Sequence, residues 1–282
     1  MSTLVSTGAI AAMSNSFLLE DSNLSAVESK DKTRIINQLI DDSGMKEMIE
    51  QLPAMVAVSF DQQPPPPINR DKFDKFREHF IQVFDPVKIR RTVTNNFSAQ
   101  YEAKRFSELL ALVNSPLAKK MTALEVEAST PQAQQEMMQM GDVIMGEASP
   151  SRLELVQKLD EVMSATESGL DMQMMMTESM MINMNKIVPS TQRMTEEQLG
   201  QMLNQIRMQS LFPARQYMQL SFVYAYRTIS DSELNEYIQL YQSEIGRWSV
   251  SLMREVWLNV SENIATDLAG RIKKEFIEVD AL

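Results

Sequence analysis

Proline directly after a helix-capping residue recurs along this chain, and this pairing constrains the fold more than any other feature. Examples are Asp85-Pro86, Ser115-Pro116 and Ser149-Pro150. In each pair the first side chain can accept a hydrogen bond from the first helical turn, and proline fits the first helical position because no N–H donor is needed there. Apolar residues at helical spacing follow each pair. The chain is therefore predicted to begin a new helix at each of these points.

Signals for β-strands are scarce. The 282 residues include 8 Gly and 11 Pro, too few turn residues to separate many short strands. No alternation of apolar and polar residues is long enough to indicate a strand. Ser230 and Glu233 also form the pattern of a capping box in front of another apolar helix face. The prediction is an all-α protein.

The expected organisation is two related multi-helix units behind a flexible leader. The leader, or signal-peptide remnant, covers residues 1–30, the N-terminal unit residues 31–148 and the C-terminal unit residues 149–282. Consecutive prolines predict a stiff, extended spacer over residues 62–67, because proline removes a helical donor. A long amphipathic helix over residues 248–276 is expected near the end of the chain.

Two points of the C-terminal unit bear on where its helices break. From Pro150 to Ile187 the apolar pattern indicates either one long helix or two helices separated near Gly169. Further along, Phe212-Pro213 is expected to interrupt a helix, because proline in a helix interior clashes with the preceding turn.

Two stretches of the chain look like copies of each other. Each has an apolar helix face, a break at a serine and a second helix, with Ser115 matching Ser243. A period near half the chain indicates two related helical units rather than a solenoid of short repeats. The apolar positions that match are Phe106 with Leu234, Leu109 with Tyr237, Leu112 with Leu240, Val113 with Tyr241, and Leu117 with Ile245.

The second copy carries a family resemblance. Its segments Ser232-Glu233-Leu234 and Leu240-Tyr241-Gln242-Ser243, together with Gly246, resemble the bacterial domain-of-unknown-function family twenty fifty-nine. The family pattern has a proline where this chain has Glu244.

The first copy matches the same family less completely. Ser115-Pro116 and Lys119-Lys120 fit the pattern, whereas Ala118 replaces its glycine and Arg105 occupies its acidic position. The resemblance implies a helical, exported bacterial protein without an assigned activity, and it brings no catalytic residue with it.

Acidic residues outnumber basic ones, 38 to 27, for a formal net charge of −11. This balance repels nucleic-acid backbones and anionic lipid. The short basic segments at residues 88–91 and 271–274 fit solvated helix faces. No apolar run approaches the ~18–20 residues that a membrane span requires. We expect neither a nucleic-acid partner nor a membrane span.

Few residues suited to catalysis or metal binding are present. There is no cysteine, and His79 is the single histidine. One imidazole supplies too few ligands for a zinc site, and His79 is expected to be structural. Paired carboxylates could hydrolyse glycosides, but none of the 38 acids forms a pair that stands out. We expect no enzyme and no cofactor, with a carboxylate-based hydrolase as the third functional hypothesis.

The N-terminus resembles the end of a signal peptide. Residues 4–13 are apolar and include the small residues of Gly8-Ala9-Ile10-Ala11-Ala12, although no Lys or Arg precedes Lys30. A periplasmic or secreted location is expected, or a cytoplasmic one if residues 1–13 are not a signal remnant.

Methionine is unusually frequent, with 23 residues. Met172, Met176, Met180 and Met184 fall on one helix face at a spacing of four. Thioethers are soft ligands for Cu(I) or Ag(I), but such a stripe also suits an adaptable core or partner groove. The favoured hypothesis is a non-enzymatic bacterial envelope protein that binds another protein, or itself, through a methionine- and aromatic-lined surface. The alternative is Cu(I) or Ag(I) binding by these four methionines.

Overall fold

The computed structural model describes residues 29–61, 70–187 and 193–277, and these residues are almost entirely helical with no strand among them. The predicted all-α fold is confirmed. Residues 1–28 and the proline spacer at 62–67 lie outside the described residues. Within the described ranges, no helix has the length and apolar character needed to cross a membrane.

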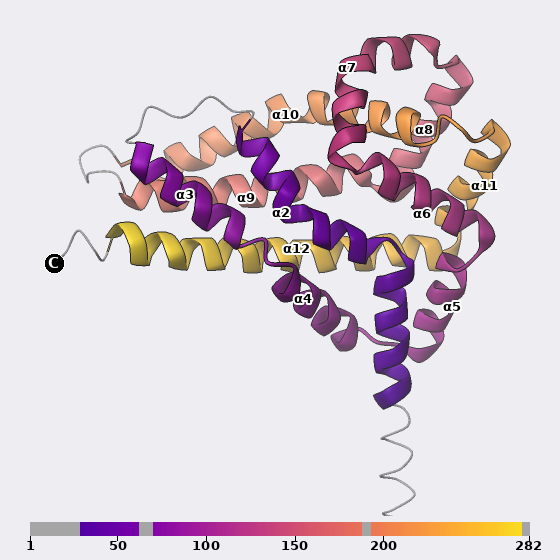
Figure 1. The fold of residues 1–282 in the computed structure, drawn as a ribbon, viewed down its shortest axis with the longest axis horizontal. Helices are drawn as coiled ribbons and strands as arrows, with labels where there is room; N and C mark the ends of the chain where they lie inside the picture. The colour runs from indigo at the N-terminus through magenta and orange to yellow at the C-terminus, as the bar shows by residue number, and fades with distance from the viewer. Residues whose placement is uncertain (1–28, 62–69, 188–192, 278–282) are drawn as a thin grey trace, which may run out of the picture.

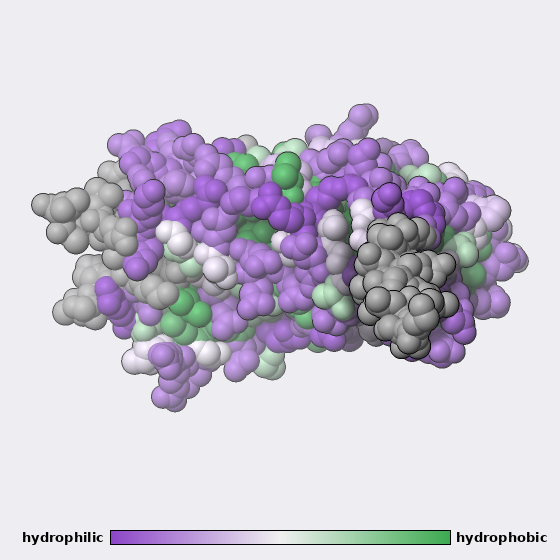
Figure 2. Space-filling model, turned by 90° about the horizontal axis from the view of Figure 1, so that it is seen from below, coloured by the Kyte–Doolittle hydropathy of each residue, from purple (hydrophilic) through white to green (hydrophobic). Residues whose placement is uncertain are grey.

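A helix over residues 29–42 comes first, and the remaining helices are named here in chain order. They are α2 (Met45–Asp61), α3 (Arg70–Gln82), α4 (Pro86–Ala99), α5 (Ala103–Val113), α6 (Pro116–Ala128), α7 (Pro131–Glu147), α8 (Pro150–Met163), α9 (Ala165–Ile187), α10 (Glu196–Ala225), α11 (Asp231–Gln242), α12 (Glu244–Ile272) and the π-helix η2 (Lys273–Ile277). The long helix α12 runs along most of the elongated molecule, and α9 packs between α12 and α10 (Figure 1). The face shown in Figure 2 is mostly hydrophilic, with hydrophobic residues scattered over it.

Helix starts follow the capping signals in the sequence. Asp85 accepts a hydrogen bond from the backbone nitrogen of Val87 at 2.8 Å, and Ser115 and Ser149 cap α6 and α8 in the same way. The capping box of Ser230 is also formed. Thr130 followed by Pro131 caps α7, a helix that was not among those predicted. Local capping chemistry therefore fixes where these helices begin.

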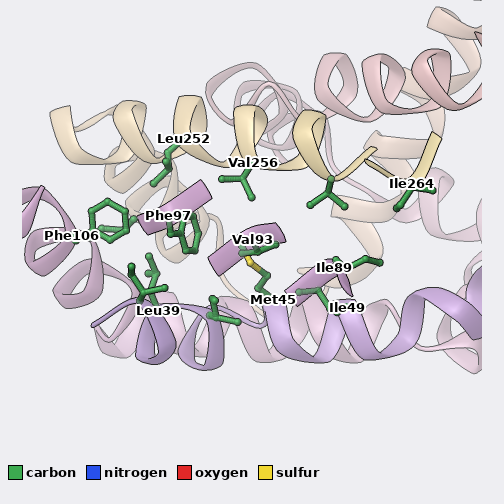
Figure 3. Close-up of a cluster of buried hydrophobic side chains, with 14 of the residues drawn as sticks. Leu39, Met45, Ile49, Ile89, Val93, Phe97, Phe106, Leu252, Val256 and Ile264 are labelled. Carbon is green, nitrogen blue, oxygen red and sulfur yellow. The ribbon is translucent and has the colours of Figure 1, made fainter. Parts of the chain in front are cut away.

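The first buried cluster joins α12 to the helices of residues 29–113 (Figure 3). Every fourth residue of α12 from Leu252 to Ile272 is buried, so one stripe of this helix faces the cluster. The opposite side of the cluster comes from the helix of residues 29–42 and from α2, α4 and α5. Their buried side chains include Leu39, Ile49 and Phe97. Phe106 of α5 is fully buried and contacts Trp248 edge to face, with ring centroids 5.6 Å apart.

The second buried cluster is formed by α6, α7, α8, α11 and the last turns of α10. Neither cluster is confined to one side of residue 148, because α12 joins the first and α6 and α7 join the second. The division into two repeated units at this residue is not confirmed and stays a prediction.

Two predicted breaks differ from the structure. The chain turns between α8 and α9 at Ser164, which has a φ of 49°, and not near Gly169. Asp160 stabilises this turn by accepting hydrogen bonds from the backbone nitrogen and the hydroxyl of Thr166, at 2.7 and 2.6 Å. Pro213 does not interrupt α10, which continues through it. Packing of α10 along α9 outweighs the hydrogen bond that proline cannot donate.

Candidate functional site

A cavity of about 340 Å³ lies where the two clusters meet, among α2, α5, α6, α11 and α12. This volume is within the roughly 300–1,000 Å³ of typical small-molecule sites. Met48, at its edge, is 38% exposed. Most of the lining side chains are apolar, and they include Met45, Met48, Leu109, Leu112, Val113, Val126, Met163, Met253 and Trp257.

Glu125 of α6 is the centre of a hydrogen-bonded network in the cavity wall. Tyr226 donates a short hydrogen bond to its Oε1 atom, and the Tyr237 hydroxyl donates to the same oxygen at 2.9 Å. The Tyr237 and Tyr241 hydroxyl oxygens are 3.3 Å apart, and their rings meet edge to face. Because Tyr237 and Tyr241 are one turn apart on α11, this helix presents both hydroxyls to α6.

The three tyrosines stay protonated over a wide pH range. Burial raises the pKa of Tyr226, Tyr237 and Tyr241 above the ordinary phenol value, and the negative charge of Glu125 raises each pKa further. The phenols at this wall are therefore neutral hydrogen-bonding groups near pH 7.

Two polar atoms of the cavity lining have no internal partner. The Ser43 hydroxyl oxygen and the Gln51 side-chain oxygen are both buried, and neither finds a hydrogen bond within the described part of the chain. A buried polar group left without a partner costs about 1–3 kcal/mol. If either side chain turned toward the cavity, its oxygen could accept a hydrogen bond from a molecule that enters it.

Gly44 holds Ser43 against α6. Its φ is +75°, a conformation that favours glycine, and an added Cβ would come within 2.8 Å of the Thr122 Cγ2 atom. A larger residue would push the turn before α2 away from α6. The position of Ser43 in the wall thus depends on glycine at residue 44.

The predicted methionine stripe lies elsewhere. Met172, Met176 and Met180 are on α9 and are half-buried, and Met176 packs against the first cluster. The side chain of Met184 lies outside the described residues. None of the four lines the cavity between the clusters. Binding of Cu(I) or Ag(I) by this stripe stays a prediction.

His79, the single histidine, is also absent from the cavity lining. His79 of α3 has its Nε2 atom 3.9 Å from the Glu275 carboxylate. Among the described residues, no group of three or more His, Cys, Asp or Glu side chains is arranged to hold a metal ion.

Sequence reasoning did not identify the cavity residues. Glu125, Ser43 and Gln51 carry no local signal that separates them from other polar residues. In the predicted pairing of the two stretches, Tyr237 and Tyr241 match Leu109 and Val113, so this pairing marks them as hydroxyl groups at positions where the other stretch is aliphatic.

Comparison of the chain with protein-family models finds no matching model, and comparisons with curated proteins and with solved structures find no match either. The resemblance to the domain-of-unknown-function family twenty fifty-nine therefore stays a prediction.

Proposed function

We propose that this protein is a non-enzymatic binding protein that takes a ligand with a largely apolar body into the cavity between the two clusters. The observation that carries the proposal is the lining itself, a wall of methionine, leucine, valine and tryptophan side chains around a few polar groups. Small-molecule sites commonly combine apolar walls with a few polar groups that orient the ligand.

The chemistry of the polar groups supports binding over catalysis. A general base must accept a proton near the working pH, and the raised pKa values of Tyr237 and Tyr241 keep these phenols protonated. Glycoside hydrolysis needs a pair of carboxylates, and Glu125 is the single carboxylate among the lining residues. Hydrogen bonding by neutral phenols is suited to holding a ligand.

Calorimetric titration with n-propylbenzene tests the proposal. We expect saturable binding to the wild type and its loss in Leu112→Trp, because the larger side chain fills part of the cavity. Met138→Trp is the matched control, since residue 138 is 66% exposed on α7 and away from the cavity. Equal binding by Leu112→Trp, or none by the wild type, would count against the proposal.

A second candidate function is association with another protein, or with a second copy, through α7 and α10. Large apolar side chains are unusually exposed there: Met208 at 80%, Phe212 at 68% and Met138 at 66%. Met208 and Phe212 are one turn apart on α10, so they share a face. Methionine and aromatic side chains are common at protein interfaces.

Sedimentation velocity over a range of concentrations tests self-association. The double variant Met208→Glu/Phe212→Glu should remain monomeric at concentrations where the wild type associates, and Met202→Glu is a control on the same helix. A wild type that stays monomeric throughout would remove the self-association form of this hypothesis.

Export to the bacterial envelope remains a hypothesis supported by the pattern of residues 1–13. Soft-metal binding likewise remains a hypothesis. It is tested by Cu(I) titration against a competing chelator, comparing the wild type with the variant in which Met172, Met176, Met180 and Met184 are all leucine.

A further inference from the structure

We infer that the ligand of the cavity carries an ammonium group that pairs with Glu125. This inference rests on the proposed binding function and names the chemistry of the ligand. Its basis is a single carboxylate in a wall whose other described residues are uncharged, together with two oxygen atoms that have no hydrogen-bond partner in the described part of the chain.

Glu125 is the one charged residue among the described residues that line the cavity. It is half-buried, and no Lys, Arg or His side chain forms an ion pair with it in the part of the chain that the structure describes. Tyr226 and Tyr237 both bind its Oε1 atom, while Oε2 has no hydrogen bond from any described residue. The carboxylate is therefore oriented by two phenols and retains one oxygen for a ligand.

The other polar atoms of the wall match the donors of a primary ammonium group. Such a group has three N–H donors and no acceptor. Glu125 Oε2 can accept one of these hydrogen bonds. The buried oxygens of Gln51 and Ser43, which have no partner among the described residues, can accept the other two once their side chains turn toward the cavity. A neutral apolar ligand would leave these acceptors unsatisfied.

Charge and wall composition favour a cation for three further reasons. Forming a buried ion pair usually requires both ions to lose water, but here the fold has already removed Glu125 from part of its water. Trp257 and Tyr241 line the same cavity, and aromatic rings attract cations. At longer range, the net charge of −11 draws cations toward the protein.

A matched pair of probes tests the inference. Phenethylammonium and n-propylbenzene have the same carbon framework, except that an ammonium group replaces the terminal methyl. The wild type should bind phenethylammonium about tenfold more tightly at neutral pH, because hydrogen bonds to charged groups are strong. Glu125→Gln should remove this preference while n-propylbenzene still binds, since the amide oxygen can still accept from Tyr226 and Tyr237.

Gln51→Leu is the second variant, and it keeps the charge of the wall. It should reduce the preference for phenethylammonium about threefold and leave n-propylbenzene unaffected. Because the comparison of the two probes on the wild type needs no variant, the test does not depend on Glu125→Gln folding.

The possible results separate the two proposals. If n-propylbenzene binds the wild type and phenethylammonium binds no tighter, the ammonium inference is overturned and the binding function stands. If the preference persists unchanged in Glu125→Gln, the assignment to Glu125 is overturned. If neither probe binds, both proposals fail.

Discussion

The two helix–serine–helix junctions of this protein begin alike and differ in how closely their helices approach. The first junction links α5 to α6 through Ser115, and the second links α11 to α12 through Ser243. Both serines are extended and cap the next helix, Ser115 by accepting from the nitrogen of Ala118 at 3.3 Å and Ser243 from that of Gly246 at 3.0 Å.

The third residue after the cap makes the difference. In the first junction Ala118 fits with its Cβ buried. In the second, a Cβ on Gly246 would lie 2.1 Å from the Leu240 carbonyl oxygen and 2.6 Å from the Tyr241 Cα atom. Glycine thus allows α12 to start directly against the end of α11, which is where Tyr241 enters the cavity wall. Equivalent caps can therefore support different packing distances.

The largest expected effect comes from exchanging these two residues. Gly246→Ala should lower the free energy of unfolding by about 3 kcal/mol or more, because backbone atoms cannot move aside as side chains do. Ala118→Gly should cost about 1 kcal/mol, the usual price of glycine in a helix. Urea denaturation of both variants measures the difference. Equal losses would show that the two junctions are packed alike.

Removing the caps should give a smaller difference. Ser115→Ala should cost about 1 kcal/mol and Ser243→Ala about 2 kcal/mol. The second serine has more to lose, because its hydroxyl also donates to the Leu240 carbonyl at 2.5 Å. Thermal and urea unfolding of the two variants check the order. A larger loss for Ser115→Ala would contradict the closer association of the second junction.

The smallest expected effect concerns the ion pair that links the two junctions. The Nζ atom of Lys120 on α6 lies 2.6 Å from the Oε1 atom of Glu233 on α11. The hydrogen bond from Lys120, and then those from Ser230, lower the pKa of Glu233 from 4.5 to about 2. A carboxyl with a lowered folded-state pKa stabilises the fold above its unfolded pKa, and that stability is lost as the pH falls.

The free energy of unfolding of the wild type should therefore fall more steeply between pH 4.5 and pH 2 than that of Glu233→Gln. Glutamine preserves the capping box at this position, so the comparison isolates the charge. Lys120→Met should flatten the profile in the same way, and the difference should shrink at high salt because the pair is exposed. Parallel pH profiles for wild type and Glu233→Gln would contradict the link.

The sequence predicted the helices better than it predicted their contacts. Helix starts were readable because a cap and its proline act within a few residues, as at Asp85 and Ser149. Thr130-Pro131 carries the same signal, so α7 could also have been predicted. The break predicted at Pro213 was wrong, because the packing of α10 along α9 involves residues far apart in the sequence and leaves no signal near the proline.

The candidate site was largely hidden from the sequence. Glu125 is one of 38 acidic residues, and its partners Tyr226 and Tyr237 are about a hundred residues away along the chain. Only the fold brings them together. The predicted pairing of the two stretches sets the tyrosines of α11 against aliphatic residues, but their role depends on the close packing of the second junction, and Gly246 is the sequence signal for that packing.

The most direct test of the cavity uses the two tryptophans of the chain. Trp257 lines the cavity, whereas Trp248 packs against Phe106 outside it. In Trp248→Phe, where Trp257 is the remaining tryptophan, titration with n-propylbenzene should shift the fluorescence emission saturably. In Trp257→Phe the remaining Trp248 should show no such shift. A response of equal size from both variants, or from Trp248 alone, would contradict binding in the cavity between the two clusters.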